Sequence, residues 1–346
     1  MPEESIQEAN SLPISLGKIF EELREGVVIF SNGDELSQVQ IVFFNAAALT
    51  ILGEDSVLGS RIPLPQVFRE PDCMKWIWLG PNAEFNLDRK YVVLSLRRKL
   101  IESESKSYIL IIFEDITRRV RLEETRQKFI SNMSHELKTP ITSMSLALGN
   151  LQESPRDLFD QNIGILSRSI DRMKQLIEDL ADLSSIETAA ELEKEDFINL
   201  YEFTSDIFHD FKRKSSERGI TLVVQIDSEF EKMLVRTNKL RLYQIIHNLI
   251  SNAFKYANPQ SKVLLNFDLK AEQMIIQVKD EGPGIAIMEQ EKIFERFYRT
   301  SSARGLPGTG LGLSIVKQLV KKLGGTIYLK SELGGSSVFT ISLPLT

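Results

Sequence analysis

Hydrophobic and polar positions divide the chain into three stretches with different periods. The first stretch, residues 16–117, contains short β-rich runs separated by turn residues, which is typical of strands. Between its second and third runs the chain is rich in glycine and proline and predicts short helices and loops. An antiparallel sheet with helices on one face is the expected fold. The four runs are Val27 to Phe30, Ile41 to Phe44, Tyr91 to Leu96 and Tyr108 to Phe113.

The second stretch, residues 118–188, has apolar residues spaced by three and four, which predicts two long helices. The second helix alternates these spacings strictly, as a heptad seam does. Pro155 suits the first turn of a new helix, so we expect an antiparallel hairpin with a short loop at Ser154 and Pro155. A homodimer that forms a four-helix bundle would cover both apolar stripes. The stripes are Ile130, Met133, Leu137, Ile141, Met144, Leu148 and Leu151, then Ile163, Leu166, Ile170, Met173, Ile177 and Leu180.

The third stretch, residues 197–346, mixes strands and helices and predicts an α+β layer domain with its own core. Residues 1–15 form an N-terminal segment, and residues 189–196, rich in Glu and Ala, are the expected linker between the second and third stretches. The expected strands are Thr221 to Ile226, Lys262 to Leu269, Met274 to Val278, Thr326 to Lys330 and Ser337 to Leu343. The expected helices are Tyr201 to Arg218, Lys239 to Tyr256 and Ser314 to Leu323.

Composition narrows the class of protein. With 42% hydrophobic and 26% charged residues among 346, the chain reads as a globular protein of two or three domains. The net charge of -6 argues against direct DNA binding, which favours a basic surface. No run approaches the ~20 apolar residues of a membrane helix, and the acidic N-terminus does not resemble a signal peptide. We therefore expect a cytoplasmic protein without membrane insertion. The single cysteine, Cys73, excludes an intramolecular disulfide and a multi-cysteine metal site.

His135 is the most informative residue for chemistry. It lies in the first long helix, about 160–200° away from the seam residues Met133 and Leu137, so it faces solvent. A neutral imidazole is a usable nucleophile for a γ-phosphate, and the adjacent carboxylate of Glu136 is a candidate general base for the ring proton. Pro140 lacks a backbone N–H and should loosen or kink the helix one turn later. A lone exposed histidine would be an ordinary surface residue, so the interpretation depends on the rest of the chain.

Three segments of the C-terminal stretch suit a nucleotide. Asn248, Asn252, Lys255 and Tyr256 share one helix face, and amide oxygens and an ammonium suit Mg²⁺ and phosphate. Asp280 follows a strand in Asp280-Glu281-Gly282-Pro283-Gly284, where glycines allow close approach of a ligand. The loop from Gly308 to Ser314 opens a helix whose free N–H groups favour phosphate. Each segment alone also reads as an ordinary polar helix face or turn, and the loop is neither a P-loop nor a dinucleotide fingerprint.

The order of these segments, together with Phe294-Glu295-Arg296-Phe297-Tyr298-Arg299, resembles the N, G1, F and G2 boxes of the GHKL ATP-binding fold. The string from Phe129 to Thr142 resembles the phosphoacceptor box of sensor histidine kinases. The two resemblances together imply an ATP- and Mg²⁺-dependent protein-histidine kinase that phosphorylates its own His135. They imply that Asn252 coordinates Mg²⁺, that Asn248 and Lys255 lie near the phosphates and that Tyr256 lies near the nucleotide. They also imply that Asp280 accepts a hydrogen bond from the adenine amino group and that Arg299 stabilises the transferring phosphate. Thr300 to Pro307 would be a mobile lid, and the nucleotide loops would contain Gly282, Gly284, Gly308, Gly310, Leu311 and Gly312.

The phosphoacceptor box and the string Asn252 to Tyr256 are most similar to the PhoR/EnvZ-like branch of these kinases. That resemblance implies an OmpR-type response regulator as partner, with transfer of phosphate to an aspartate of its receiver domain. Glu136 and Thr139 match a Glu-x-x-Thr pattern linked to dephosphorylation of the regulator, which implies a second, phosphatase activity. One departure is Asn238, where relatives commonly carry Asp.

Residues 16–117 resemble a PAS domain, a sensor fold, through Glu25 to Phe30, Phe43 to Ala48 and Phe113 to Thr117. No histidine precedes His135, which argues against a His-ligated haem. The surroundings of Cys73 do not resemble the flavin-adduct motif of light-sensing PAS domains. We therefore predict no cofactor for this domain.

Two other functional classes are compatible with parts of the sequence. One is a GHKL ATPase machine or a protein-serine kinase that does not use His135, which predicts acid-stable phosphate or hydrolysis alone. The other is a non-catalytic scaffold with a decayed ATP site, which the intact chemically active residues in every box disfavour.

Overall fold

The computed structural model describes residues 14–52, 62–103, 106–153, 159–188, 195–230, 233–303, 306 and 308–345. The chain separates into two compact units, Met1–Lys128 and Phe129–Thr346, each with its own core. The predicted loop at Ser154 and Pro155 lies outside the described residues.

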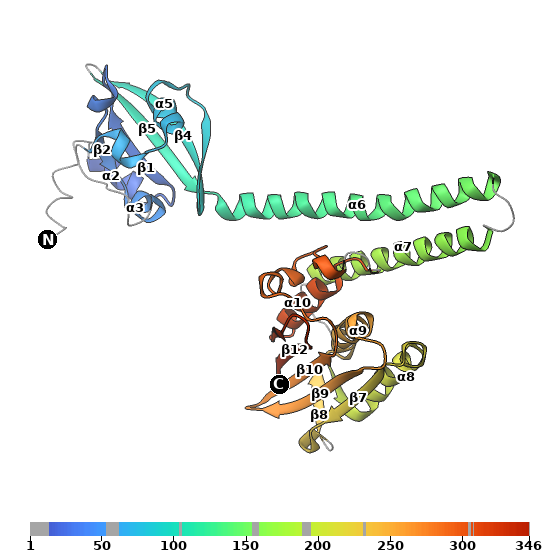
Figure 1. The fold of residues 1–346 in the computed structure, drawn as a ribbon. Helices are drawn as coiled ribbons and strands as arrows, with labels where there is room; N and C mark the ends of the chain where they lie inside the picture. The colour runs from blue at the N-terminus through green and yellow to red at the C-terminus, as the bar shows by residue number, and fades with distance from the viewer. Residues whose placement is uncertain are drawn as a thin grey trace. The chain divides into compact units, whose positions relative to one another are not determined.

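The first unit is built on a five-stranded antiparallel sheet in the order β2-β1-β5-β4-β3 (Figure 1). Alternation places Val28 and Phe30 in the main core and Val27 and Ile29 in a smaller cluster on the other face. All four predicted strands are present. Its strands are β1 Gly26–Ser31, β2 Ile41–Phe44, β3 Glu84–Arg89, β4 Val92–Ser103 and β5 Lys106–Asp115, and its helices before α6 are α2 Ile14–Glu21, α3 Ala46–Leu52, α4 Leu64–Val67 and α5 Pro71–Leu79, with a 3-10 turn η1 Leu36–Gln38.

Strand β3 was not predicted. It is an edge strand in which Leu87 is the one buried residue, so its polar sequence carries little of the alternation that indicates a strand. Helix α5 is capped at its C-terminal end by the buried Arg98, whose guanidinium donates to the carbonyl oxygens of Ile77 and Trp78 at 2.6 and 3.2 Å.

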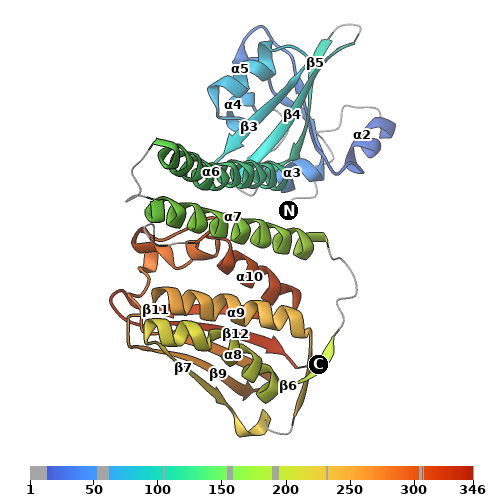
Figure 2. The same ribbon diagram turned by 90° about the vertical axis from the view of Figure 1, so that its right-hand side faces the viewer.

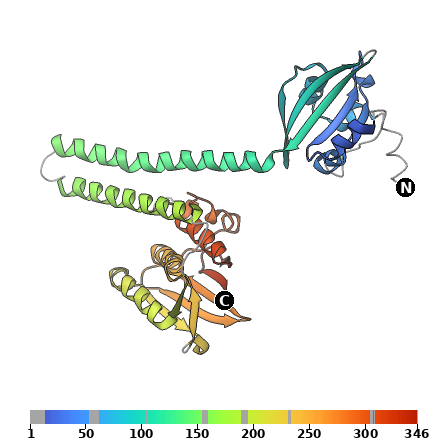
Figure 3. The same ribbon diagram turned by 180° about the vertical axis from the view of Figure 1, so that it is seen from behind.

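Two long helices follow, α6 Thr117–Glu153 and α7 Phe159–Thr188, and they run side by side in opposite directions (Figures 1 and 3). The predicted hairpin is therefore confirmed. Helix α6 continues through Pro140 without a break. Along α7 the seam residues Ile163, Ile170 and Ile177 are 44%, 55% and 57% exposed in the single chain.

The C-terminal part of the second unit is a two-layer domain. A five-stranded sheet in the order β11-β12-β10-β9-β7 buries the face formed by alternate residues such as Val263, Leu265 and Phe267 against helices α8, α9 and α10 (Figure 2). The strands are antiparallel except for the parallel pair β7 and β9. Its elements are β6 Asp196–Asn199, α8 Leu200–Arg218, β7 Thr221–Ile226, β8 Leu234–Thr237, α9 Lys239–Tyr256, β9 Lys262–Lys270, β10 Gln273–Asp280, α10 Gly312–Lys322, β11 Thr326–Ser331 and β12 Ser337–Pro344, with short 3-10 turns η3 Ser228–Phe230, η4 Ile287–Glu289, η5 Lys292–Phe294 and η6 Ser301–Ala303.

The predicted α+β fold class, with an N-terminal antiparallel sheet, a helical hairpin and a C-terminal layer domain, is confirmed. The strands β6 and β8 were not predicted. They form a separate antiparallel pair of four residues each, and four residues give too short a pattern to distinguish a strand from a loop. The end of α7 packs on the C-terminal domain, because Leu183 and Ile186 belong to the same buried cluster as α9 and α10.

Candidate functional site: a nucleotide pocket beside the helical hairpin

A pocket of about 530 Å³ lies where α9, the turn after β10, the loop before α10 and α7 meet. Most residues predicted for the ATP site line it, although they come from distant parts of the chain. Of the predicted set, the lining residues are Asn248, Asn252, Lys255, Tyr256, Asp280, Gly284, Arg299, Gly308, Gly310 and Gly312.

Helix α9 supplies the polar face. Asn238 caps its N-terminus by accepting a hydrogen bond from the Arg241 N–H at 2.9 Å, so the departure from Asp keeps the capping oxygen. One face of α9 is buried in the core, and this forces Asn248 and Asn252 toward the pocket. The side-chain amide nitrogen of Asn248 donates to the Gln244 carbonyl oxygen at 3.0 Å, so the side-chain oxygen of Asn248 takes no part in that bond.

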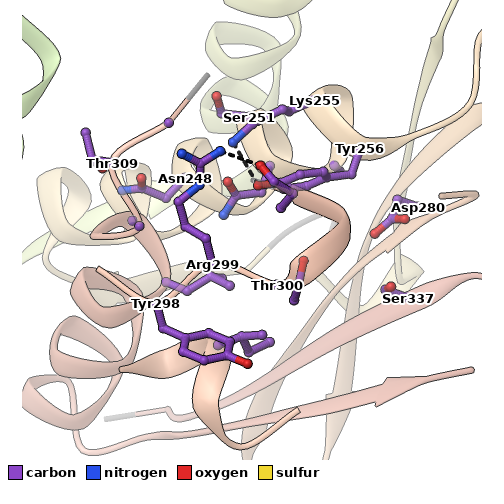
Figure 4. Close-up of a pocket in the computed structure, with 18 of the residues that line it drawn as sticks. Asn248, Ser251, Lys255, Tyr256, Asp280, Tyr298, Arg299, Thr300, Thr309 and Ser337 are labelled. Carbon is purple, nitrogen blue, oxygen red and sulfur yellow. Dashed lines mark hydrogen bonds between the residues drawn. The ribbon is translucent and has the colours of Figure 1, made fainter. Parts of the chain in front are cut away.

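Lys255 sits at the end of this face in a cationic environment. Its ammonium donates to the Tyr256 hydroxyl at 2.8 Å. Burial, together with the positive charges of Arg299 and Arg172, lowers the pKa of Lys255 to about 8. Figure 4 shows Arg299 close to Lys255. Arg299 also donates to the carbonyl oxygens of Ala303 and Leu306, which ties it to the segment predicted as a lid.

Asp280 occupies a different side of the pocket, beside Ser337 (Figure 4). Only 5% of Asp280 is exposed, and burial raises its pKa to about 6. It accepts a hydrogen bond from the Gly282 N–H at 2.9 Å. A buried carboxyl oxygen at one side and cations at the other suit a ligand with a neutral donor group at one end and phosphates at the other.

Glycines are required where the backbone closes on the site. Gly284 has φ of +67°, and a Cβ there would lie 1.8 Å from the Glu332 carbonyl oxygen. At Gly308, with φ of +148°, a Cβ would lie 2.4 Å from the Lys255 ammonium. Two predicted residues do not line the pocket: Gly282, whose N–H holds Asp280, and Leu311, which is fully buried just before α10.

The loop around Gly308 leads into helix α10, as predicted. Thr309 is buried, and its hydroxyl accepts from the Leu311 N–H at 3.2 Å, which shapes the start of the helix. The same hydroxyl donates to Asp179 of α7 at 2.5 Å. This bond ties the predicted phosphate loop to the hairpin.

The phosphoacceptor residues lie outside this pocket. His135 is exposed, as predicted, and Thr139 is exposed one turn later, where its hydroxyl donates to the His135 carbonyl oxygen at 3.1 Å. Glu136 is half-buried and accepts from the Arg172 guanidinium at 2.7 Å. The structure therefore gathers the ATP boxes into one site but does not bring His135 into it.

The sequence interpretation missed the wall that α7 contributes. This wall is a polar stripe on the side of α7 opposite the isoleucine seam, with the spacing of three and four that marks one helix face. That spacing is the sequence signal that could have indicated this wall. Its residues are Arg168, Asp171, Arg172, Gln175 and Asp179.

The side-chain oxygens available in the pocket are of the kind that the predicted Mg²⁺ role of Asn252 requires. Mg²⁺ prefers oxygen ligands and is often bound through one or two protein groups plus substrate phosphates. Asn248 and Asn252 offer amide oxygens on the pocket wall. Across the described ranges, no cluster of three or more His, Cys, Asp and Glu could hold a metal ion.

The fold and this pocket define a protein with a PAS-like sheet domain, a helical hairpin that carries an exposed histidine, and an ATP-binding layer domain. Comparisons with known families agree. Residues 237–346 match the family described as "Histidine kinase-, DNA gyrase B-, and HSP90-like ATPase", residues 125–189 match "His Kinase A (phospho-acceptor) domain", and residues 16–84 match "PAS domain".

The similar proteins are sensor kinases. The chain is 31% identical over 332 residues to the sensor histidine kinase WalK of Bacillus subtilis, covering 93% of this chain and 52% of that protein. It is 32% identical over 351 residues to the sensor protein kinase WalK of Staphylococcus aureus, covering 95% and 80%. The chain belongs to the sensor histidine kinase family. It spans about half the length of the Bacillus subtilis relative.

Solved structures support the fold. The histidine kinase ThkA, solved in complex with the response regulator protein TrrA, aligns with a TM-score of 0.52 at 20% identity, covering 95% of this chain and 98% of that one. The histidine kinase AdeS of Acinetobacter baumannii aligns with a TM-score of 0.50 at 24% identity over 61% of this chain and 98% of that chain. In the part of the chain that the structure describes, no helix is long and apolar enough to span a membrane.

Proposed function

We propose that this chain autophosphorylates His135 with ATP and passes the phosphoryl group to an aspartate of a response regulator. The observation that carries the proposal is the convergence of Asn248, Lys255, Asp280 and the Gly308 loop on one pocket, in the same compact unit as the exposed His135. We also propose that the reaction takes place in the cytoplasm, where ATP and a response regulator would be available.

Each end of the pocket suits one part of ATP. The buried carboxyl of Asp280 suits the adenine amino group, and Tyr256 lies between Asp280 and Lys255 (Figure 4). Lys255 and Arg299 bring positive charge to the phosphates, which are bound best by charge-assisted hydrogen bonds. Asn252, with Asn248 nearby, would hold Mg²⁺, which when bound neutralises phosphate charge.

In the transfer step a ring nitrogen of His135 attacks the γ-phosphorus, the bond to the bridging oxygen breaks and ADP leaves. The proton from the imidazole goes to the Glu136 carboxylate. Because His135 does not line the pocket in this arrangement, the ATP domain has to move relative to the hairpin before transfer. Arg299 would then stabilise the transferring phosphate, and closure of the lid segment would exclude water.

The partner we propose is the receiver domain of an OmpR-type regulator. Support for a response regulator as partner comes from ThkA, which was solved in complex with the response regulator protein TrrA, and the OmpR type is proposed from the resemblance to the PhoR/EnvZ-like branch. Thr139 and Glu136 lie on the same helix as His135 at the spacing of the Glu-x-x-Thr pattern, so we also propose that they serve dephosphorylation of the regulator.

We further propose a homodimer. The exposed isoleucines of α7, at a spacing of seven, form an apolar stripe that a second hairpin would cover in a four-helix bundle. Ile170→Lys should convert a dimer to a monomer in light scattering, whereas Ile287→Lys, at an exposed position in the ATP domain, should leave the mass unchanged. A monomeric wild-type chain would contradict this proposal.

Incubation with γ-labelled ATP and Mg²⁺ tests the kinase proposal. We expect acid-labile, alkali-stable label on the wild type and none on His135→Gln. His209→Gln is the matched control, because His209 is also an exposed helical histidine, on α8. Asn252→Asp should abolish labelling while the fold is retained. Label that survives in His135→Gln, or acid-stable label, would favour a serine kinase, and hydrolysis without label would favour an ATPase.

A further inference from the structure

Helix α7 presents two opposite faces. One carries the exposed isoleucines, and the other carries Arg168, Arg172, Gln175 and Asp179, which line the nucleotide pocket. The hairpin is therefore a wall of the pocket. The contact is held at Asp179 by the buried hydrogen bond from Thr309, and Gln175, one turn earlier on α7, donates to the other Asp179 oxygen at 3.0 Å.

Arg172 is the cation of this wall that contacts both Glu136, beside His135, and the nucleotide pocket. One terminal nitrogen donates to the Glu136 carboxylate at 2.7 Å, next to the phosphoacceptor His135. Arg172 also lines the pocket, and its positive charge contributes to lowering the pKa of Lys255. Its Nε is buried, and among the described residues it has no hydrogen-bond partner.

Among the described residues, the cations at this end of the pocket have one carboxylate partner, Glu136, which pairs with Arg172. Arg172, Arg299 and Lys255 converge there, and the Nε of Arg299 is likewise buried with no partner in the described parts of the chain. Of the three lining carboxylates, Asp179 accepts from Thr309 and Asp280 accepts from the Gly282 N–H, whereas Asp171 is exposed to solvent. Three converging cations with unused donors suit an anion with several oxygens, and arginine binds phosphate through such donors.

We propose that Arg172 binds the phosphate tail of ATP from the hairpin side of the pocket while the same guanidinium holds Glu136. The inference rests on the proposed nucleotide site and adds a residue from outside the ATP-binding domain. Because the binding residue belongs to the hairpin, occupancy of the pocket and docking of the hairpin stabilise each other. Nucleotide binding also acts, through Arg172, on the carboxylate beside His135.

Titration of the full chain with MgATP tests the phosphate contact directly. Arg172→Ala should weaken binding about tenfold or more, the scale of losing one charge-assisted hydrogen bond. Arg172→Lys should recover part of the affinity, since it keeps the charge without the planar fork. Lys174 is exposed on α7 and points about 200° away from Arg172 around the helix axis. Lys174→Ala therefore removes an equal charge on another side of the helix and should leave the affinity unchanged. An Arg172→Ala affinity within twofold of wild type overturns the proposal.

Glu136→Gln separates the phosphate contact from a structural role of the ion pair, with nucleotide affinity as the readout. It breaks the same pair from the other side but keeps the guanidinium, so affinity should stay within twofold of wild type. A loss equal to that of Arg172→Ala would show that the pair only supports the fold, and would overturn the proposal.

Kinetics of His135 labelling give a second readout. Because Arg172 lines the pocket and His135 does not, the loss in Arg172→Ala should appear in KM for ATP, with kcat changed less than threefold. A fall in kcat alone, with affinity unchanged, would mean that Arg172 acts only through Glu136 and would overturn the phosphate contact. A wild-type chain that binds ATP without labelling would contradict the kinase proposal, and the titration would still test Arg172.

Discussion

At the scale of single residues, burial decides the chemistry of the pocket. Asp280 ends strand β10 in an almost fully buried position, so its charged form loses hydration that the backbone hydrogen bonds from Gly282 and Ser337 do not fully replace. Lys255 is also partly desolvated, and the neighbouring guanidinium groups disfavour its charge further. Both groups are therefore destabilised without a ligand, and a nucleotide with an amino group at one end and phosphates at the other would relieve both.

The pKa of Asp280 predicts a stability cost. With a value of about 6 against 3.8 for the ordinary group, the folded state holds the proton more tightly than the unfolded state, so stability falls as pH rises from about 4 to 6. Asp280→Asn should remove this loss. Calorimetry should show the variant near wild type at pH 4 and more stable at pH 7 by on the order of 2 kcal/mol.

The same variant should bind ATP at least tenfold more weakly, because it replaces the acceptor proposed for the adenine amino group. The paired result, higher stability with lower affinity, is expected of a residue retained for binding. A stability difference that is equal at pH 4 and pH 7 would contradict the burial argument.

At the scale of elements, the site depends on how α7 meets α10. The hydroxyl of Thr309 joins them, since it donates to Asp179 and accepts from the Leu311 N–H. Burial raises the pKa of Asp179, and the hydrogen bond from Thr309 opposes that rise because it stabilises the charged carboxylate. Gln244 donates to Asp182 at 3.1 Å one turn further along α7, so the contact extends to α9.

Thr309→Val keeps the side-chain shape but removes both hydrogen bonds. We expect a loss of about 1–3 kcal/mol, the cost of unsatisfied buried groups. Hydrogen exchange should become faster at the start of α10 and in the facing turn of α7. Thr326→Val, at an exposed position of β11, is the control and should change stability by less than about 0.5 kcal/mol. Unchanged exchange in Thr309→Val would mean that the apolar contacts alone hold the two helices together.

At the scale of the whole molecule, one continuous helix connects the two compact units. Helix α6 begins at Thr117, directly after the last strand of the PAS-like domain, and carries His135 farther along. A change in its packing at the start would alter the rotation of the phosphoacceptor, which is a physical route for a signal.

An insertion into α6 tests this route. One extra residue after Arg121 rotates the following helix by about 100°, so the initial rate of His135 labelling should change at least several-fold in either direction. Insertion of seven residues, which nearly restores the phase, should return the rate toward wild type. Equal rates in all three chains would show that the helix does not transmit rotation.

The local patterns were sufficient for most elements and for the chemically active residues. Strands such as β9 and β10 bury one face, so a period of two is visible without knowledge of their neighbours. Exposure of His135 followed from its angle to the seam. The nucleotide residues could be predicted because the order of the asparagine helix, the Asp280 turn and the glycine loop resembles the boxes of the GHKL fold. Strand β3, with one buried residue, gave no such pattern.

The sequence by itself therefore determined most of the elements and the exposure of His135, because these depend on local period, and the order of the motifs predicted the ATP-site residues through their resemblance to a known family. Only the tertiary structure decided that α7 closes the pocket with Arg172 and Asp179, and that His135 stays outside it. The face of a helix that meets another domain is selected by docking. Docking depends on contacts between residues far apart in the chain, such as Asp179 with Thr309. The polar stripe marks one face of α7, but its spacing does not say which domain packs against that face.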